Sequence, residues 1–200
     1  MHVAYDPADG SLIFESNDHK NSLGYWFLPK DASVPVQLRL RRIDYMSGFA
    51  FDTQGRLYFG YNGDLWTGAV CSLPDDEARG QWICGIRIAP VADLETSIGT
   101  PSNQGIQETA PSGEVVYVHL RRLGGSGWGQ IATLSAAAIK FVDGEAEDDS
   151  YEKRLGLYQN ELKSIRLLGE NGSYGYLCAS RSGHKIFYRA EDAQDQKMKI

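Results

Sequence analysis

The chain has 200 residues, of which 42% are hydrophobic, 11% aromatic and 23% charged. This composition is sufficient for a well-filled core in one large domain or two small ones, and it argues against a disordered chain. The formal net charge of -6 at pH 7 argues against a general binder of nucleic acid or anionic membranes, because phosphate groups are held by clustered Lys and Arg.

No apolar run approaches the roughly 20 residues needed to cross a bilayer, so we expect no membrane insertion. The first residues, "MHVAYDPADG", have neither a charged n-region nor an apolar h-region, and they enter a strand-like pattern at once. We therefore expect a trimmed, mature form, and the compartment stays open.

Four segments share one pattern along the chain: an extended apolar lead, a polar bend that ends in glycine, and an aromatic-rich strand. The bend glycines are Gly10, Gly55, Gly113 and Gly172, in "VAYDPADGSLIFES", "FAFDTQGRLYFGY", "IQETAPSGEVVYVH" and "IRLLGENGSYGYLC". Their spacings are 45, 58 and 59 residues. Glycine supplies the positive φ of a tight hairpin, and aromatic and β-branched residues suit a half-buried strand. The pattern predicts four β-hairpins.

A third strand follows each hairpin after a polar loop: "GYWFLP" from Gly24, "GDLWTGAV" from Gly63, "GWGQIATL" from Gly127 and "GHKIFYRA" from Gly183. Residues 35–40 and 81–91 are extended enough for fourth strands, and residues 155–158 and 196–200 are weaker candidates. Four strands repeated at this period predict propeller blades in an all-β fold. We expect seven side chains to be mainly buried: Phe49, Phe51, Leu57, Phe59, Trp66, Val116 and Phe187.

These repeats resemble the WD-like repeats of TolB-type β-propellers. Asp9-Gly10 and Pro111-Ser112-Gly113 match the Ser-Pro-Asp-Gly turn of that family best, whereas Gln54-Gly55 and Asn171-Gly172 depart from it. The segment "GRLYFGYNGDLW" is more weakly similar to hemopexin-like four-bladed propellers. The resemblance implies one β-propeller domain over residues 1–200, with approximate blades at 1–44, 45–100, 101–160 and 161–200. It slightly favours a periplasmic or secreted location.

The number of blades leaves three interpretations. A six-bladed ring at about 50 residues per blade needs roughly 300 residues, more than this chain has. The chain is then part of a larger ring, a closed four-bladed ring, or an open arc completed by another copy. An open arc exposes apolar blade faces at both ends.

For two other segments the sequence predicts a strand or a loop, and not a helix or a metal site. Residues 130–142 have some helical composition, but Thr, Ile and Val are mixed in, which favours a third strand that runs into a short turn. Residues 143–154 are rich in acids without the spaced Asp-x-Asp-x-Asp-Gly pattern of a calcium loop, so we expect a solvated loop and no metal.

The chain has three cysteines: Cys71, Cys84 and Cys178. A hairpin about "SLPDDEARGQ" would place Cys71 opposite Cys84, so a cross-strand disulfide is conceivable and would imply an oxidising compartment. We favour buried free thiols. No Cys-x-x-Cys pair exists, which argues against a zinc site.

No recognised catalytic motif is present, so the candidate site rests on position. Loops between the second and third strands of a propeller emerge at one end of the ring. We place six candidate ligand-binding residues in them: His19, His119, Arg121, Arg122, Arg181 and His184. Convergent His and Arg side chains could hold a carboxylate, a phosphate or a metal.

Two functional classes remain. We favour a non-catalytic binding module for a protein or peptide partner, or for an anionic small molecule, without a cofactor and with homo-oligomerisation left open. The alternative is a propeller enzyme, similar to polysaccharide lyases or hydrolases, that acts on an acidic sugar through His and Arg.

Overall fold

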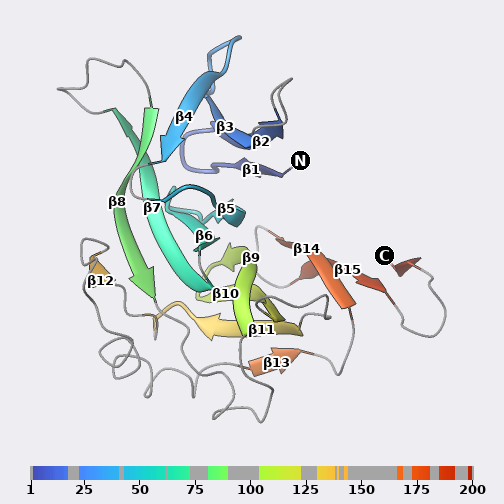
Figure 1. The fold of residues 1–200 in the computed structure, drawn as a ribbon. Helices are drawn as coiled ribbons and strands as arrows, with labels where there is room; N and C mark the ends of the chain where they lie inside the picture. Colours follow the sequence, from blue (N-terminus) through green and yellow to red (C-terminus); the bar gives the residue numbers. More distant parts are fainter. Residues whose placement is uncertain are drawn as a thin grey trace.

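The computed structural model describes residues 2–17, 23–40, 43–61, 63–72, 81–89, 104–122, 130–137, 139, 142–143, 166–168, 173–180, 185–191 and 198–199. These residues form strands, turns and connections, and no helix occurs among them (Figure 1), so the all-β fold class is confirmed. Within the same part of the chain, no helix is long and apolar enough to cross a membrane.

The first four strands form an antiparallel meander in chain order, which we call unit 1. They are β1 (Val3–Tyr5), β2 (Leu12–Asn17), β3 (Leu23–Leu28) and β4 (Val36–Leu40). Side chains alternate between the two faces of a strand. One face of unit 1 is buried and contains Ala4, Ile13, Tyr25, Phe27 and Leu38.

The next four strands form a second antiparallel meander, unit 2. They are β5 (Ser47–Phe51), β6 (Leu57–Tyr61), β7 (Asp64–Ser72) and β8 (Gln81–Ala89). Phe49, Phe51, Leu57, Phe59 and Ile83 of this unit join the buried face of unit 1 in one hydrophobic core.

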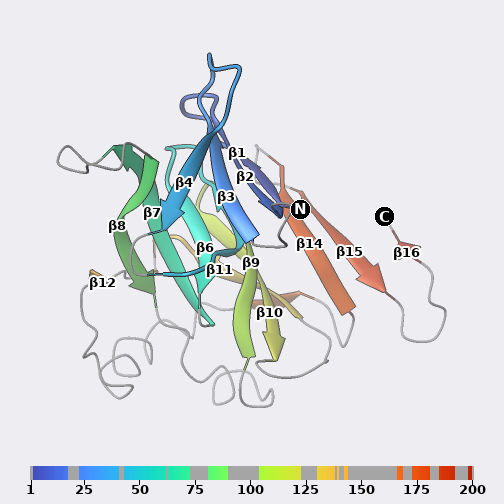
Figure 2. The same ribbon diagram turned by 45° about the horizontal axis from the view of Figure 1, so that its top comes forward.

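Units 1 and 2 are also joined at their outermost strands, because β4 pairs in parallel with β8, from Leu38 opposite Gln81 to Leu40 opposite Ile83. The strand order is β1-β2-β3-β4-β8-β7-β6-β5, and the end strands β1 and β5 pack against each other. The result is a nearly closed mixed sheet (Figures 1 and 2). The short strand β12 (Val142–Asp143) pairs with the far half of β8. Separate blades would not share edge strands in this way.

Unit 3 is a four-stranded antiparallel sheet of β9 (Gln104–Ser112), β10 (Val115–Arg122), β11 (Gln130–Ser135) and β13 (Arg166–Leu168). Unit 4 is β14 (Ser173–Ala179), β15 (Ile186–Glu191) and β16 (Met198–Lys199). The sequence pattern predicts that residues 166–168 pair with the strand after Gly172. In the structure these residues form β13, which pairs with β11, and the strand after Gly172, β14, pairs with β15. The hairpin predicted around Gly172 is therefore not formed by these strands.

Three of the predicted bend glycines have the expected conformation. Gly10, Gly55 and Gly113 have φ values of 84°, 78° and 59°, each between two antiparallel strands. This is the left-handed region that favours glycine. Gly172 lies outside the described residues.

The burial predictions hold for five of seven residues: Phe49, Phe51, Leu57, Phe59 and Val116. Trp66 is half-buried and packs against the core, whereas Phe187 is exposed. The indole N–H of Trp66 donates to the Tyr61 carbonyl, at a donor to acceptor distance of 3.0 Å, so its polar edge has a partner while its ring packs on the core. Phe187 is exposed because its face of unit 4 has no neighbouring unit among the described strands.

Cys71 and Cys84 form a disulfide between β7 and β8, with their Cα atoms 5.9 Å apart. The preference for free thiols is therefore wrong for this pair. The predicted hairpin is present, but in its register Cys71 is opposite Trp82 and Cys84 is opposite Ala69, so the disulfide is diagonal. Both cysteines still lie on one face, because residues two apart share a face. Cys178 is free and exposed.

Candidate functional site

The four units meet at one pocket of about 200 Å³. Four strands pack in succession, β1 against β5, β5 against β9, and β9 against β14. Each lies at an end of its strand order, and among the described strands none pairs with its inner edge. Their carboxyl-terminal ends lead to the pocket, to which every unit contributes two residues: Tyr5 and Pro7, Phe51 and Thr53, Pro111 and Ser112, Ala179 and Ser180.

The turns that follow these strands are built alike in three of the units. The N–H of Asp6 donates to the Ser11 carbonyl (2.9 Å), that of Asp52 to the Arg56 carbonyl (2.9 Å), and that of Ser180 to the Lys185 carbonyl (2.8 Å). Unit 3 uses a tighter turn, in which Ser112 is opposite Val115. Asp6, Asp52, Ser112 and Ser180 therefore occupy equivalent positions at the start of a hairpin turn.

The pocket walls are mainly apolar, from two aromatic rings, two prolines and an alanine. Four lining residues carry a hydroxyl group: Tyr5, Thr53, Ser112 and Ser180. Ser112 Oγ donates to the carbonyl of Ser180 at 3.1 Å, which joins units 3 and 4 at the pocket. Among the residues that the structure describes, no charged side chain lines this pocket, so an uncharged group fits its chemistry best.

The carboxylate of Asp52 shapes the turn beside the pocket. Its Oδ1 accepts the N–H groups of Gln54 (2.8 Å) and Arg56 (2.9 Å), and its Oδ2 is 2.7 Å from Nε of Arg56. The guanidinium of Arg56 also lies over the ring of Tyr58, 5.9 Å from its centroid. The turn is thus fixed by an ion pair as well as by backbone hydrogen bonds.

The equivalent carboxylate of unit 1, Asp6, has a different environment. Its Oδ1 accepts the Ala8 N–H at 2.8 Å, and the side chain lies against Gly55 of the next turn. Burial raises the pKa of Asp6 above its usual value, and the nearby charges of Asp9 and Asp52 act in the same direction. In the turn of unit 2, the carboxylate of Asp52 is paired with a cation, whereas in the neighbouring turn of unit 1 the ionised form of Asp6 is disfavoured.

The six residues of the predicted site are only partly described. His119, Arg121 and Arg122 belong to strand β10 and not to a loop, with a register irregularity between His119 and Leu120. The Gly113 turn, which lies at the pocket, precedes the first residue of β10. The other end of β10, with these three residues, therefore lies away from the pocket. Nothing is described of these three side chains, while His19, Arg181 and His184 lie outside the described residues. The convergence of His and Arg stays a prediction.

The fourth histidine, His2, has a structural role. Its Nε2 lies 2.8 Å from the carbonyl oxygen of Phe49, and its ring meets that of Phe49 edge to face, with centroids 4.6 Å apart. The described residues contain no group of three or more His, Cys, Asp or Glu side chains that could hold a metal ion.

Sequence reasoning missed the pocket-lining residues. Proline, alanine, serine and threonine have no distinctive chemical pattern, and they share only a place at the end of an innermost strand or in the first residues of the turn that follows. Aligning the residues just before the bends, rather than the loops after the second strands, would have pointed to this end of the strands. Searches with the sequence found no matching model of a protein family and no matching curated protein.

Proposed function

We propose that the chain is a non-catalytic binding module in which the four units act as blades around an axis, and that the pocket receives one uncharged apolar side chain of a peptide or protein partner. The observation that carries this proposal is the shared pocket, since each unit supplies two residues from the end of its innermost strand and the start of the turn that follows. Sites where repeats converge on a rigid scaffold commonly bind ligands.

The chemistry and size of the pocket support this class of ligand. Ligand pockets are mostly apolar with a few placed polar groups, and the hydroxyl-bearing residues of this pocket provide such groups. A volume of about 200 Å³ is below the range of about 300–1,000 Å³ that is typical for drug-sized ligands. A single aliphatic or aromatic side chain is the better match.

The parallel pairing of β4 with β8 limits the similarity to a propeller, because it fuses units 1 and 2 into one sheet. The arrangement of the innermost strands supports the similarity, because β1, β5, β9 and β14 pack in order and end at one place. We therefore propose blades that share one outer edge.

The proposal can be tested by nuclear magnetic resonance titration with the N-acetyl amides of leucine, tyrosine, lysine and glutamate. We expect the leucine and tyrosine amides to shift amide signals around Phe51, Thr53 and Ser112, and the two charged amides to bind at least tenfold more weakly. Ala179→Phe should fill the pocket and abolish the shifts. The matched control is Ala137→Phe, which alters an exposed turn alanine and should leave them unchanged.

The proposal fails if neither apolar amide binds, or if Ala179→Phe binds as the unaltered protein does. Stronger binding of the glutamate amide, with shifts along β10, would instead favour the anionic ligand predicted from His119, Arg121 and Arg122.

A further inference from the structure

Unit 1 has a second apolar face, on the side away from unit 2. The register places Val3 opposite Phe14 and Phe14 opposite Trp26, and it places Tyr5 opposite Leu12 and Leu12 opposite Leu28. These six side chains alternate with the buried residues of the same strands, and none of them is buried. Val3 and Tyr5 are 51% and 59% exposed. Contiguous apolar patches of this kind commonly mark interaction sites.

The same positions are covered in unit 2. Tyr5 and Phe51 both precede the aspartate of the turn, and both pair with the first leucine of the next strand, Leu12 or Leu57. Counting from these pairs, Val3, Phe14 and Trp26 correspond to Phe49, Phe59 and Trp66. Phe49, Phe51, Leu57 and Phe59 are buried against unit 1. The exposed face of unit 1 therefore has the same residue pattern as the face of unit 2 that packs against the unit before it in the chain.

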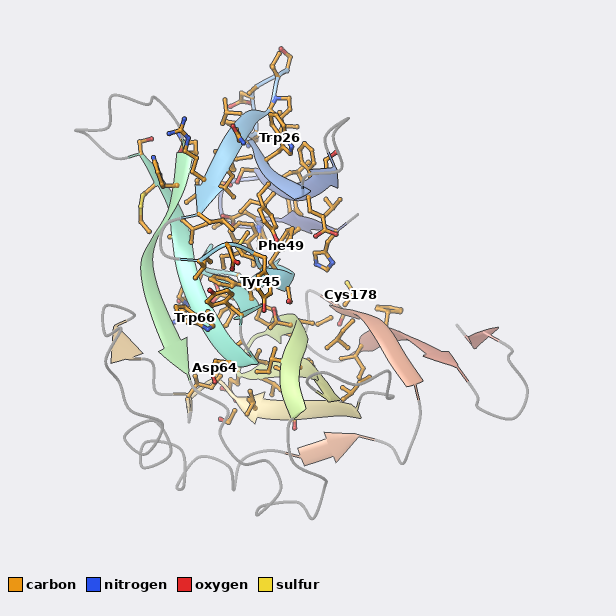
Figure 3. All side chains as sticks on the ribbon, in the orientation of Figure 1. Trp26, Tyr45, Phe49, Asp64, Trp66 and Cys178 are labelled. Atoms are coloured by element: carbon orange, nitrogen blue, oxygen red, sulfur yellow. A yellow bond between two sulfur atoms is a disulfide. The ribbon has the colours of Figure 1, made fainter. Side chains whose placement is uncertain are left out.

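Unit 4 has the opposite face open. Its side toward unit 3 packs Leu177, Ala179 and Ile186 against Ala110 and Ile131. The alternate residues face the other way: Cys178, which pairs with Phe187, is exposed, and Phe187 is 58% exposed. In units 1 and 3 the positions equivalent to Cys178 are Ala4 and Ala110, and both are buried against the following unit. Figure 3 labels Trp26 on unit 1 and Cys178 on unit 4, the two units that carry the open faces.

The open faces of units 1 and 4 are thus the two complementary surfaces of one further contact between units. Within one chain this contact is not made, because Val3 and Tyr5 on unit 1 stay exposed. We propose that a second copy of this chain covers these faces, with unit 4 of each copy packed on unit 1 of the other. The contact would reproduce the packing already seen between units 1 and 2. Such a head-to-tail contact forms a closed dimer when it is made twice. This proposal does not depend on what the pocket binds.

Two substitutions outside the pocket test this arrangement. Val3→Glu and Phe187→Glu each place a charge on one open face without altering a pocket residue. We expect the unaltered protein to be dimeric in sedimentation-velocity experiments, and each variant alone to be monomeric at the same concentration. Val34→Glu, at a 69% exposed valine outside both faces, is the matched control and should stay dimeric.

A mixture of the two variants distinguishes head-to-tail packing from other contacts. The Val3→Glu chain keeps an intact unit 4 face, and the Phe187→Glu chain keeps an intact unit 1 face. Mixing them should restore dimers through the one intact contact, with weaker affinity than the unaltered dimer. A symmetric contact of unit 1 with unit 1, or of unit 4 with unit 4, would leave one of the variants dimeric alone and would contradict the proposal.

The free thiol of Cys178 gives an independent measure. We expect its rate of reaction with a maleimide to fall at least tenfold as the protein concentration rises through the dimerisation range, and Val3→Glu to abolish this protection. A monomer with a reactive Cys178 at every concentration would overturn the proposal. A monomer with a protected Cys178 would also overturn it, because unit 4 would then close on unit 1 of its own chain.

Discussion

The two faces of unit 2 meet their neighbours in different ways. The face toward unit 1 is filled by large side chains, among them Phe49 and Phe59, which are fully buried. The contact with unit 3 is made by backbone: the N–H of Ile106 donates to the Gly63 carbonyl at 2.9 Å, and the Ile106 carbonyl lies against Gly60. The interface with unit 1 depends on large side chains that fill it, whereas the interface with unit 3 depends on a glycine that has no side chain.

A hydroxyl completes the contact between units 2 and 3. Thr109 Oγ1 lies 2.9 Å from the carbonyl oxygen of Gly48 and 3.0 Å from that of Tyr58, and Thr109 is itself buried. Backbone groups that end inside a protein need hydrogen-bond partners. One sheet can therefore use an apolar core on one side and close backbone packing on the other, and each interface should fail under a different kind of substitution.

Loss of volume should damage the interface with unit 1 most. Phe59 is fully buried and stacks on Trp66, with ring centroids 6.4 Å apart. Phe59→Ala removes this packing and leaves a cavity, so we expect a loss of about 3–5 kcal/mol in the free energy of unfolding, measured by urea denaturation. Val34→Ala, at an exposed valine, should change it by less than about 0.5 kcal/mol. A loss below about 1 kcal/mol for Phe59→Ala would contradict a core at this place.

Gain of volume should damage the interface with unit 3. A Cβ atom at Gly60 would overlap the carbonyl oxygen of Ile106, which is backbone and cannot rotate away. We expect Gly60→Ala to destabilise the fold by about 3 kcal/mol, the upper end of overpacking effects. Gly24→Ala is the matched control in another strand, where the nearest atom, Trp26 Nε1, would be 3.4 Å away. Equal stability of the two variants would argue that units 2 and 3 do not pack as closely as described.

A polar link within the apolar interface gives an intermediate effect. The buried Tyr25 hydroxyl donates to the Met46 carbonyl (2.9 Å) and accepts from the Met46 N–H (2.7 Å), which ties unit 1 to the segment that enters unit 2. Tyr25→Phe leaves both backbone groups without these bonds, so we expect a loss of about 2 kcal/mol. Tyr5→Phe, at an exposed tyrosine, should be neutral in the same denaturation experiment. If both variants are neutral, Met46 has other partners.

The comparison of these interfaces shows what the sequence could predict. Local patterns located the strands: the aromatic strand after Gly55 and the alternating Val36, Leu38 and Leu40 are both strands in the structure. These signals are short-range, because a turn glycine and the strand alternation act within a few residues. The parallel pairing of β4 with β8 joins segments far apart in the chain, and no local pattern indicates it.

The fourth unit shows how a correct local signal can mislead. Asn171-Gly172 is a strong turn signal, yet the strand before it pairs with β11 and completes unit 3. The turn between Ser180 and Lys185 starts the hairpin of unit 4, and Ser180 there takes the place that Ser112 has in unit 3, at the start of the turn. Which of the two bends, Asn171-Gly172 or the turn between Ser180 and Lys185, starts the hairpin is decided by the long-range pairing of β13 with β11. The candidate site changed for the same reason, because the hairpin that forms between Ser180 and Lys185 brings Ser180 to the pocket.

The smallest predicted effect compares the turns of units 1 and 2. Because burial raises the pKa of Asp6, its ionisation disfavours the folded state. The cost is absent at low pH, where the carboxyl is protonated in both states. It grows as the pH rises from the ordinary pKa of the unfolded state towards the raised pKa of the folded state, and it is complete above the raised pKa. Asp6→Asn keeps an oxygen for the Ala8 N–H, so we expect a small stabilisation at pH 7 that vanishes below about pH 4, in urea denaturation at several pH values. Asp52→Asn should destabilise the protein at pH 7, because it breaks the ion pair with Arg56. The side chain of Arg56 is half-exposed, so this pair contributes at most about 1 kcal/mol. If Asp6→Asn destabilises the protein at pH 7, then ionised Asp6 has a favourable partner, and the two turns are more alike than their surroundings indicate.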